Sequence, residues 1–375
     1  MTSIVKAVDA AQFLSLVPRM FGFTPVRSVV VVPFAGGRSA GGMRVDLPPG
    51  EHVDGVAATL VGMVCRVEGA DACMVVVYDD AEPGSDTIGR RLIDALRRRA
   101  DACGVQLLDA LQVGPDSWRS TLDRRTRGAV AELAEPDGVG EPPKGDQRSG
   151  AELDPVPAEA CAEVAAAFGE LSHALHALAG APQPGSSGAT RERLDPAAIT
   201  AAGLLDDLPV FFDDCVAGAD VDADDPTRPD APEPYRQAAL IWCLTRPSLR
   251  DIGLVTWLGG VRAGDAAVEG QLGWEDGDEY PADLAAWMWG EGPRPDADRL
   301  LTALGCCRRA ASLAPPAHRA GPLAACAWLS WALGRLTHAE SYARRACENE
   351  ARHGLATIVL TFVAAGHLPD WAFRR

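Results

Sequence analysis

Strand-forming sequence is concentrated in the first 135 residues of this 375-residue chain, and helical periodicity prevails after them. Helical spacing at 53–67 and 86–103 separates segments rich in valine and other strand formers, which predicts an α/β domain over 1–135. The glycine-rich segment 35–41 indicates a hairpin between the first two strands, so the sheet should be mixed rather than all parallel. We therefore predict a mixed four-strand sheet with strands at 26–34, 42–47, 72–79 and 105–113.

The rest of the chain is predicted to be helical. Residues 136–195 have the proline, glycine and charge content of a linker region, with one alanine-rich helix at 158–179. From 196 to 375 we predict an all-α domain that contains an acidic loop at 218–233. Eight of the nine tryptophans follow residue 240. Large aromatic side chains at helical spacing are typical of a core, and a recognition surface is the alternative.

The last helices carry a regular pattern of small residues. Gly334, Ala339 and Ala346 have the spacing of the glycine and two alanines of a tetratricopeptide unit, and Ala327 fits the preceding small position. Small residues at these positions let paired helices approach closely. We predict that the domain ends in a tetratricopeptide-like helical hairpin, with docking of a peptide or protein partner as the alternative.

Charge and composition exclude several classes of function. The net charge of −17 argues against sequence-independent binding of nucleic acid. Lys6 and Lys144 are the only lysines, and neither fits a phosphate-binding P-loop or a Schiff-base enzyme. The ten cysteines form no Cys-x-x-Cys pair, so they predict neither a zinc ribbon nor a redox pair and suit a reducing compartment. The apolar run at 355–366 is too short to span a membrane, and we expect a cytoplasmic protein with no membrane partner and no cofactor.

Four polar residues are candidates for a ligand site at the edge of the sheet. On the second strand Arg44 and Asp46 alternate with apolar side chains and therefore share one face. Asp79 and Asp80 lie at the carboxyl end of the strand predicted at 72–79, where open α/β sheets tend to place ligands. We name these four as tentative ligand-binding residues. For Arg44 and Asp46 the alternative is an ion pair on the same face or across strands.

The main concentration of basic residues lies on the helix predicted at 86–103 and shortly after it. Arg91 and Arg98 are seven residues apart and belong to a polar stripe opposite the apolar face of that helix. They are tentative anion-binding residues, for a phosphate or a nucleic acid. The alternatives are a solvated helix face or a contact with the chain's own acidic segment.

Three further motifs match functional patterns as strings. The Gly-x-Ser-x-Gly string at 37–41 resembles a nucleophile elbow, but an elbow joins a strand to a helix and this string lies between two predicted strands. The aspartates at 220–224 have the spacing of an EF-hand loop without its glycine and its bidentate glutamate. The Glu-x-x-His strings at 170–173 and 350–353 each match half of a di-iron site, and we attribute both to chance. We therefore predict no catalytic and no metal-binding residues.

Several motifs occur together in a fixed order: PRMFGFTP at 18–25, SVVVV at 28–32, RVDLP at 44–48, WRS at 118–120 and GEGPRPD at 290–296, before a tryptophan-rich helical tail. Together they resemble an uncharacterised actinobacterial family, number forty-one ninety-two among the domains of unknown function. In that family a Cys-Cys-Pro stretch follows the Trp-Arg-Ser position, whereas residues 122–128 of this chain are rich in arginine and have no cysteine. The resemblance implies no particular activity.

Two classes of function follow from these observations. We predict a non-enzymatic protein-interaction or regulatory protein with a protein partner, because a helical hairpin, an acidic tether and an arginine patch occur without a catalytic set. The alternative is an enzyme or sensor that binds a small ligand, phosphorylated or not, at the sheet edge. A deep cavity with convergent polar groups at the four candidate residues would favour this alternative.

Overall fold

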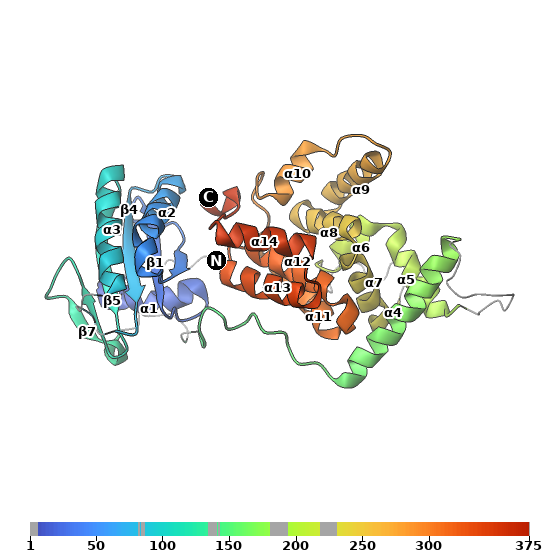
Figure 1. The fold of residues 1–375 in the computed structure, drawn as a ribbon, viewed down its shortest axis with the longest axis horizontal. Coiled ribbons are helices and arrows are strands. Elements are labelled where there is room, and N and C mark those ends of the chain that lie inside the picture. Colours follow the sequence, from blue (N-terminus) through green and yellow to red (C-terminus); the bar gives the residue numbers. More distant parts are fainter. Residues whose placement is uncertain are drawn as a thin grey trace. The chain divides into compact units, whose positions relative to one another are not determined.

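The structure is a computed structural model that describes residues 7–81, 83, 87–133, 141, 143–180, 194–217 and 231–374. The chain divides into two compact units, Met1–Ser149 with Phe373–Arg375, and Gly150–Ala372 (Figure 1). The first is an α/β unit with a mixed sheet and the second is mostly helical, as the distribution of strand formers predicts. None of the helices in the described ranges is both long and apolar enough to cross a membrane.

The α/β unit is built on one mixed sheet. Within the described residues the sheet has seven strands in the order β2-β1-β4-β5-β6-β7, and β3 also pairs with β1. β4 and β5 are parallel, and all the other pairs are antiparallel. The strands are β1 (Ser28–Ala35), β2 (Arg38–Ser39), β3 (Met43–Asp46), β4 (Ala72–Tyr78), β5 (Gln106–Val113), β6 (Ser117–Ser120) and β7 (Arg127–Ala129).

The prediction of four strands is therefore too low for this sheet. β1, β3, β4 and β5 overlap the four predicted segments, and β2, β6 and β7 are additional. The additional strands contain 2, 4 and 3 residues, which is too short for a clear two-residue alternation in the sequence. The expected hairpin is present, since Gly36 and Gly37 form the turn between β1 and β2 with φ values of 57° and 76°. The string at 37–41 thus lies in a hairpin.

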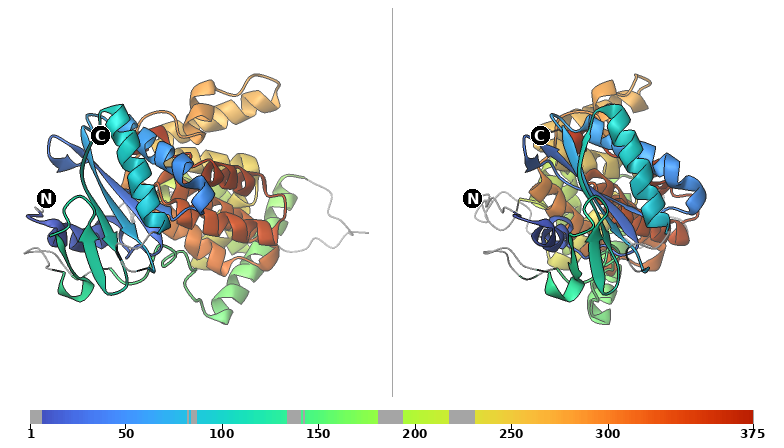
Figure 2. Two further views of the ribbon diagram at one scale, coloured as in Figure 1. Left: turned by 60° about the vertical axis from the view of Figure 1, so that its left-hand side comes forward. Right: turned by 90° about the vertical axis from the view of Figure 1, so that its left-hand side faces the viewer.

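Helices cover both faces of the sheet, as the right-hand view of Figure 2 shows. α1 packs on one face, and α2 and α3 pack on the other. In β1, Val29 and Val31 pack with α2 and α3, whereas Val30 and Val32 pack with α1, because successive side chains of a strand point to opposite faces. The helical elements of this unit are α1 (Ala10–Phe21), η1 (Gly50–His52), α2 (Val53–Arg66), α3 (Ile88–Cys103) and η2 (Val130–Glu132).

The second unit packs its helices around one large core. Trp257, Trp328 and Trp331 are among the largest fully buried side chains, as expected for core tryptophans. Its elements are α4 (Ala158–Leu178), α5 (Pro196–Gly203), η3 (Leu204–Asp206), α6 (Leu208–Asp214), α7 (Glu233–Leu244), α8 (Pro247–Gly259), α9 (Val261–Glu275), α10 (Ala282–Met288), α11 (Ala297–Leu313), η4 (Pro316–His318), α12 (Ala320–Ala332), α13 (Leu336–Asn349) and α14 (Gly354–Ala364), followed by η5 (Asp370–Phe373).

α12 runs through the core of this unit. Each of its residues from Ala320 to Ala332 is buried. Its first turn crosses the end of α7 so closely that a Cβ atom on Gly321 would lie 2.4 Å from the carbonyl oxygen of Leu244. Glycine is required here because any side chain would meet backbone atoms. The crossing therefore helps to place the short connection between α7 and α8.

Two predicted features fall on or beside undescribed residues. The acidic loop predicted at 218–233 is described only from 231 onward, and the aspartates at 220–224 lie outside the described residues. The helix predicted at 158–179 is α4, and its residues Val164, Phe168 and Leu171 pack in the core of the second unit.

Candidate functional site

A small cavity lies at the carboxyl ends of β4 and β5, where Asp79 and Asp80 follow β4. The cavity has a volume of about 300 Å³. Most of its walls are apolar side chains of α1, of the residues before β1 and of the segment after β5, such as Leu14, Pro25 and Val113. The ends of these two parallel strands thus do form a hollow, as the ligand-binding rule for open sheets predicts.

The two aspartates of this cavity already have partners within the protein. Asp80 forms an ion pair with Arg27, with 2.8 Å between Oδ2 and Nη1, and both side chains are exposed. Oδ1 of Asp79 accepts a hydrogen bond from the backbone N–H of Ala81 at 3.3 Å. Arg27 has a φ of 45°, which is unfavourable for a residue with a Cβ atom. The sheet-edge cavity is therefore small and largely apolar, and Arg27 neutralises the charge of Asp80.

Arg44 and Asp46 lie on β3, which pairs with the edge of β1 opposite to β4. They form an ion pair with each other, and Nε of Arg44 donates to Oγ of Ser28 at 2.8 Å. Burial lowers the pKa of Arg44, and the neighbouring Asp46 opposes that shift. These two residues thus form the ion pair that the sequence allowed as the alternative. The structure brings Asp79 and Asp80 together in one cavity, and it places Arg44 and Asp46 across β1 from them.

Arg91 and Arg98 lie on α3 and contact the elements that precede β4. Nη2 of Arg91 donates to the carbonyl oxygen of Gly50 at 3.2 Å. Nη2 of Arg98 lies 3.5 Å from Oδ1 of Asp54 on α2, and both side chains are exposed. Part of the arginine stripe therefore holds α3 against η1 and α2, and anion binding by these two residues stays a prediction.

A larger cavity, of about 640 Å³, lies inside the helical unit. Its walls come from the first half of α8, the end of α9, α10, Trp328 of α12 and one side of α14. Sequence reasoning missed it because α8, α9 and α10 are consecutive but α12 and α14 follow much later in the chain, and because the tryptophans that line the cavity were assigned to the core. We call it the helical cavity.

Aromatic side chains form much of the wall of the helical cavity. Trp274 and Trp289 are 57% and 51% exposed, which is unusual for tryptophan in a packed helical unit. The ring of Trp289 packs edge-on against Phe362, with 5.3 Å between the ring centroids. Trp328 is buried, and its Nε1 donates to the carbonyl oxygen of Met288 at 3.2 Å. Tyr280 lines the cavity as well. Two large aromatic rings thus leave apolar surface in water that a ligand could cover.

An arginine and an aspartate from α8 form a polar part of the same wall. Nε and Nη2 of Arg250 both lie 2.8 Å from Oδ1 of Asp251. The Arg250 side chain is only 8% exposed, whereas that of Asp251 is 40% exposed. Burial raises the pKa of Asp251, and the attraction of Arg250 opposes that shift. The pair therefore turns its carboxylate toward solvent and keeps its guanidinium inside.

His353 and Glu350 complete the polar wall at the beginning of α14. Nδ1 of the buried His353 accepts a hydrogen bond from the backbone N–H of Ala356 at 3.4 Å, so the neutral ring carries its proton on Nε2. Burial lowers the pKa of His353, the nearby Arg250 lowers it further, and Glu350 opposes the shift. The imidazole is consequently uncharged at neutral pH. His353 thus caps α14, and this structural role explains the histidine of the Glu-x-x-His string at 350–353.

The helical cavity offers no set of metal ligands among the residues that the structure describes. In those residues no group of three or more histidines, cysteines, aspartates or glutamates is arranged to hold a metal ion. The polar wall combines one cation, two carboxylates and a neutral imidazole with several aromatic rings. Such a wall suits the binding of an organic molecule that has both an apolar body and a polar group.

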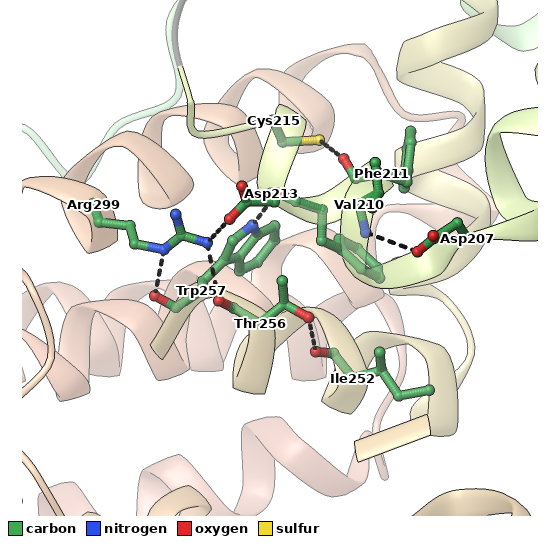
Figure 3. A network of polar contacts seen from close by, with 10 residues as sticks. Asp207, Val210, Phe211, Asp213, Cys215, Ile252, Thr256, Trp257 and Arg299 are labelled. Atoms are coloured by element: carbon green, nitrogen blue, oxygen red, sulfur yellow. Dashed lines mark hydrogen bonds and ion pairs between the residues drawn. The ribbon is translucent and has the colours of Figure 1, made fainter. Parts of the chain in front are cut away.

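A polar network fixes the far end of α8, the helix whose first half lines the helical cavity (Figure 3). Arg299 of α11 donates from Nε to the carbonyl oxygen of Trp257 at 3.1 Å and from Nη2 to that of Thr256 at 3.0 Å. Arg299 also forms an ion pair with Asp213 of α6. Nε1 of Trp257 donates to the carbonyl oxygen of Phe212 at 2.8 Å. The network adds donors to the carbonyl oxygens of Thr256 and Trp257 in the last turn of α8 and joins this helix to α6 and α11.

Few features of the sequence indicate the helical cavity. Glu350 and His353 were noticed as a string, and Arg250 and Asp251 are neighbours in sequence without any diagnostic spacing. A better signal is the position of Trp274 and the segment 275–281 that follows it, EDGDEYP. A tryptophan beside an acidic turn is poorly placed for a core, which could have indicated a binding surface.

A family model matches more than half of the chain. The model "Domain of unknown function (DUF4192)" covers residues 11–269, which agrees with the family that the motifs indicate. The motif at 290–296 and the tryptophan-rich tail lie beyond the matched residues. The matched segment runs from α1 into α9, so it includes Arg250 and Asp251 and ends before Trp289 and His353. No curated protein and no solved structure matches the chain.

Proposed function

The chain belongs to the DUF4192 family, whose function is unknown, and from its structure we propose that it is a regulatory protein that binds a small organic ligand in the helical cavity. One observation carries this proposal, namely a cavity of about 640 Å³ that is lined by aromatic rings and by a compact set of polar groups. Cavities of this size and composition are typical of small-molecule sites. The proposal keeps the predicted small ligand and moves its site from the sheet edge to the helical unit.

Binding rather than catalysis is proposed because two ionisable groups of the wall, Asp251 and His353, are engaged in structural contacts. Asp251 is held by Arg250, and Nδ1 of His353 caps α14. A general base must instead be within reach of the proton that it removes and be held in place by a further group. We also propose a cytoplasmic location, which the ten free cysteines support because such thiols are kept reduced there.

A second candidate function is docking of a protein partner on a tetratricopeptide-like hairpin formed by α12 and α13. It is supported by the complete burial of Ala327, Ala339 and Ala346, and by Gly334, whose φ of 75° follows the end of α12. Against it, α12 is buried along its whole length, so that a partner would have to dock on the outer face of α13. The sheet-edge cavity at Asp79 and Asp80 is a further, smaller candidate for a ligand.

The proposed function is tested by screening a library of small organic molecules for stabilisation of the folded protein, because a ligand that binds only the native state raises its apparent stability. The screen compares the wild type with Trp289→Ala, which removes an exposed aromatic wall of the helical cavity. Leu178→Ala, on the exposed surface of α4, is the matched control.

We expect ligands that stabilise the wild type and the Leu178→Ala protein and that have little effect on Trp289→Ala. Ligands that stabilise all three proteins equally would place the site elsewhere and contradict the proposal. A diverse library without any stabilising compound would contradict it as well.

A further inference from the structure

We propose that the ligand of the helical cavity is a small organic cation, an alkylammonium or arylalkylammonium ion with an apolar body. This inference rests on the proposed function, because it names the chemistry of the ligand that the same cavity holds. It is drawn from the charges of the wall, from the partners of those charges and from the aromatic rings beside them.

The charged side chains of the cavity wall leave an excess of negative charge. Arg250 is the one cation among its lining residues, and Asp251 and Glu350 are the two anions. His353 adds no charge because its imidazole is neutral at neutral pH. A cationic ligand would balance this excess, whereas an anionic ligand would increase it.

The hydrogen-bond partners and the exposure of these charged side chains also favour a cationic ligand. Both contacts from Arg250 go to Oδ1 of Asp251, so the second carboxylate oxygen can face the positive charge of an ammonium group. Arg250 itself is nearly buried, and Asp251 is the more exposed member of the pair. Glu350 is exposed at the end of α13, and among the described residues it forms no ion pair. A ligand that enters the cavity therefore meets carboxylate oxygens before it meets the guanidinium.

The aromatic walls supply the second element of cation recognition. The face of a tryptophan or tyrosine ring attracts a cation, and tryptophan does so most strongly. In the same unit the guanidinium of Arg246 lies 3.5 Å from the ring centroid of Trp242. No cation of the described residues lies in this way over Trp274, Tyr280 or Trp289. These three rings can therefore face an ammonium group from the ligand.

The other ligand classes leave groups unsatisfied. A carboxylate or phosphate would compete with Asp251 for Arg250 and would approach Glu350 with the same sign of charge. A neutral molecule would cover the aromatic rings and leave Glu350 without a counter-charge beside the ligand. An organic cation satisfies the rings and the carboxylates together.

The inference is tested by calorimetric titration with three probes of similar size: benzyltrimethylammonium, its uncharged carbon analogue neopentylbenzene, and the anion phenylacetate. We expect the cation to bind the wild type about tenfold more tightly than the neutral analogue, as a cation–π contact with partial desolvation would give. The anion should bind more weakly still.

Two variants assign the selectivity to the cavity. Glu350→Gln should weaken binding of the cation about threefold to fivefold and leave the neutral analogue unchanged. Glu348→Gln is the matched control, because it removes an equal charge from the exposed end of the same helix outside the cavity. Trp289→Leu keeps an apolar wall but removes the π face, so it should affect the cation more than the neutral analogue.

Failure of this inference can be distinguished from failure of the proposed function. If the neutral or the anionic probe binds as tightly as the cation and loses affinity in Trp289→Ala, the ligand class is wrong and the cavity is still a ligand site. Absence of cation binding at millimolar concentration would also overturn the inference, and the library screen then decides the proposed function separately. Equal cation affinities of the wild type and Glu350→Gln would overturn the charge argument.

Discussion

Replacing Gly321 with alanine should destabilise the helical unit, because the added Cβ atom would meet backbone rather than flexible side chains. It would lie 2.4 Å from the carbonyl oxygen of Leu244, 2.7 Å from the carbonyl carbon of the same residue and 2.9 Å from Cα of Thr245. Relief of these contacts requires α12 and the end of α7 to move apart. Overpacking of this kind typically costs about 1–3 kcal/mol, and we expect the upper part of that range because every opposing atom belongs to the backbone.

Gly305→Ala in α11 is the matched control. A Cβ atom at Gly305 has no neighbour within 4 Å, so the variant should gain about 0.5–1 kcal/mol from the helix preference of alanine. The two variants should then differ by about 3 kcal/mol in free energy of unfolding. Urea denaturation followed by tryptophan fluorescence measures this difference, and it reports mainly on the helical unit because eight of the nine tryptophans follow residue 240.

The Gly321→Ala change should also reach the helical cavity. Thr245 and Pro247, which follow the crossing of α7 and α12, both line it. Any ligand found in the library screen should therefore bind Gly321→Ala more weakly than Gly305→Ala. Equal stabilities of the two variants would refute the close crossing of these helices and, with it, this account of how the cavity wall is placed.

The other predictions concern residues that stabilise the end of α8 and the start of α14. Arg299→Ala should lower the free energy of unfolding by about 2 kcal/mol, since it removes charge-assisted hydrogen bonds from a pair whose side chains are only 23% and 29% exposed. Arg344→Ala, which breaks an exposed ion pair within α13, should cost less than about 0.5 kcal/mol, and similar losses from both changes in urea denaturation would contradict the role of the Arg299 network. Because burial lowers the pKa of His353 in the folded protein, its contribution to stability is fully present above the unfolded pKa of 6.5 and is lost as the pH falls toward the folded value. His353→Asn, which keeps a capping side chain, should therefore reduce the loss of stability below pH 6.5, and an unchanged pH profile would show that His353 does not cause it.

Local patterns made part of this fold predictable. The four consecutive valines of β1 lie two on each face of the sheet, because successive side chains of a strand point to opposite faces. The location of Asp79 and Asp80 at a hollow followed from a general rule about strand ends. The short strands β6 and β7 could not be predicted, since 4 and 3 residues carry too little pattern.

The parts of the fold and of the site that could not be predicted depend on pairing and packing between segments that are distant in the sequence. Arg44 and Asp46 lie apart from Asp79 and Asp80 because β3 joins the opposite edge of β1, and strand order depends on long-range contacts. The helical cavity depends on how five helices cross, and the crossing at Gly321 is invisible to any periodicity. Trp289 follows the same helical pattern as core tryptophans, and the packing of the unit leaves it exposed, whereas the acidic segment after Trp274 is a local signal of exposure.

The location of a bound ligand is the most direct test of this account. Crystals of the full chain soaked with 4-bromobenzyltrimethylammonium would reveal the bromine by its anomalous scattering. We predict the strongest bromine peak inside the helical cavity, between the rings of Trp274 and Trp289. A strongest peak beside Asp79 and Asp80 at the sheet edge, or no peak in the helical cavity at saturating probe, would contradict the account.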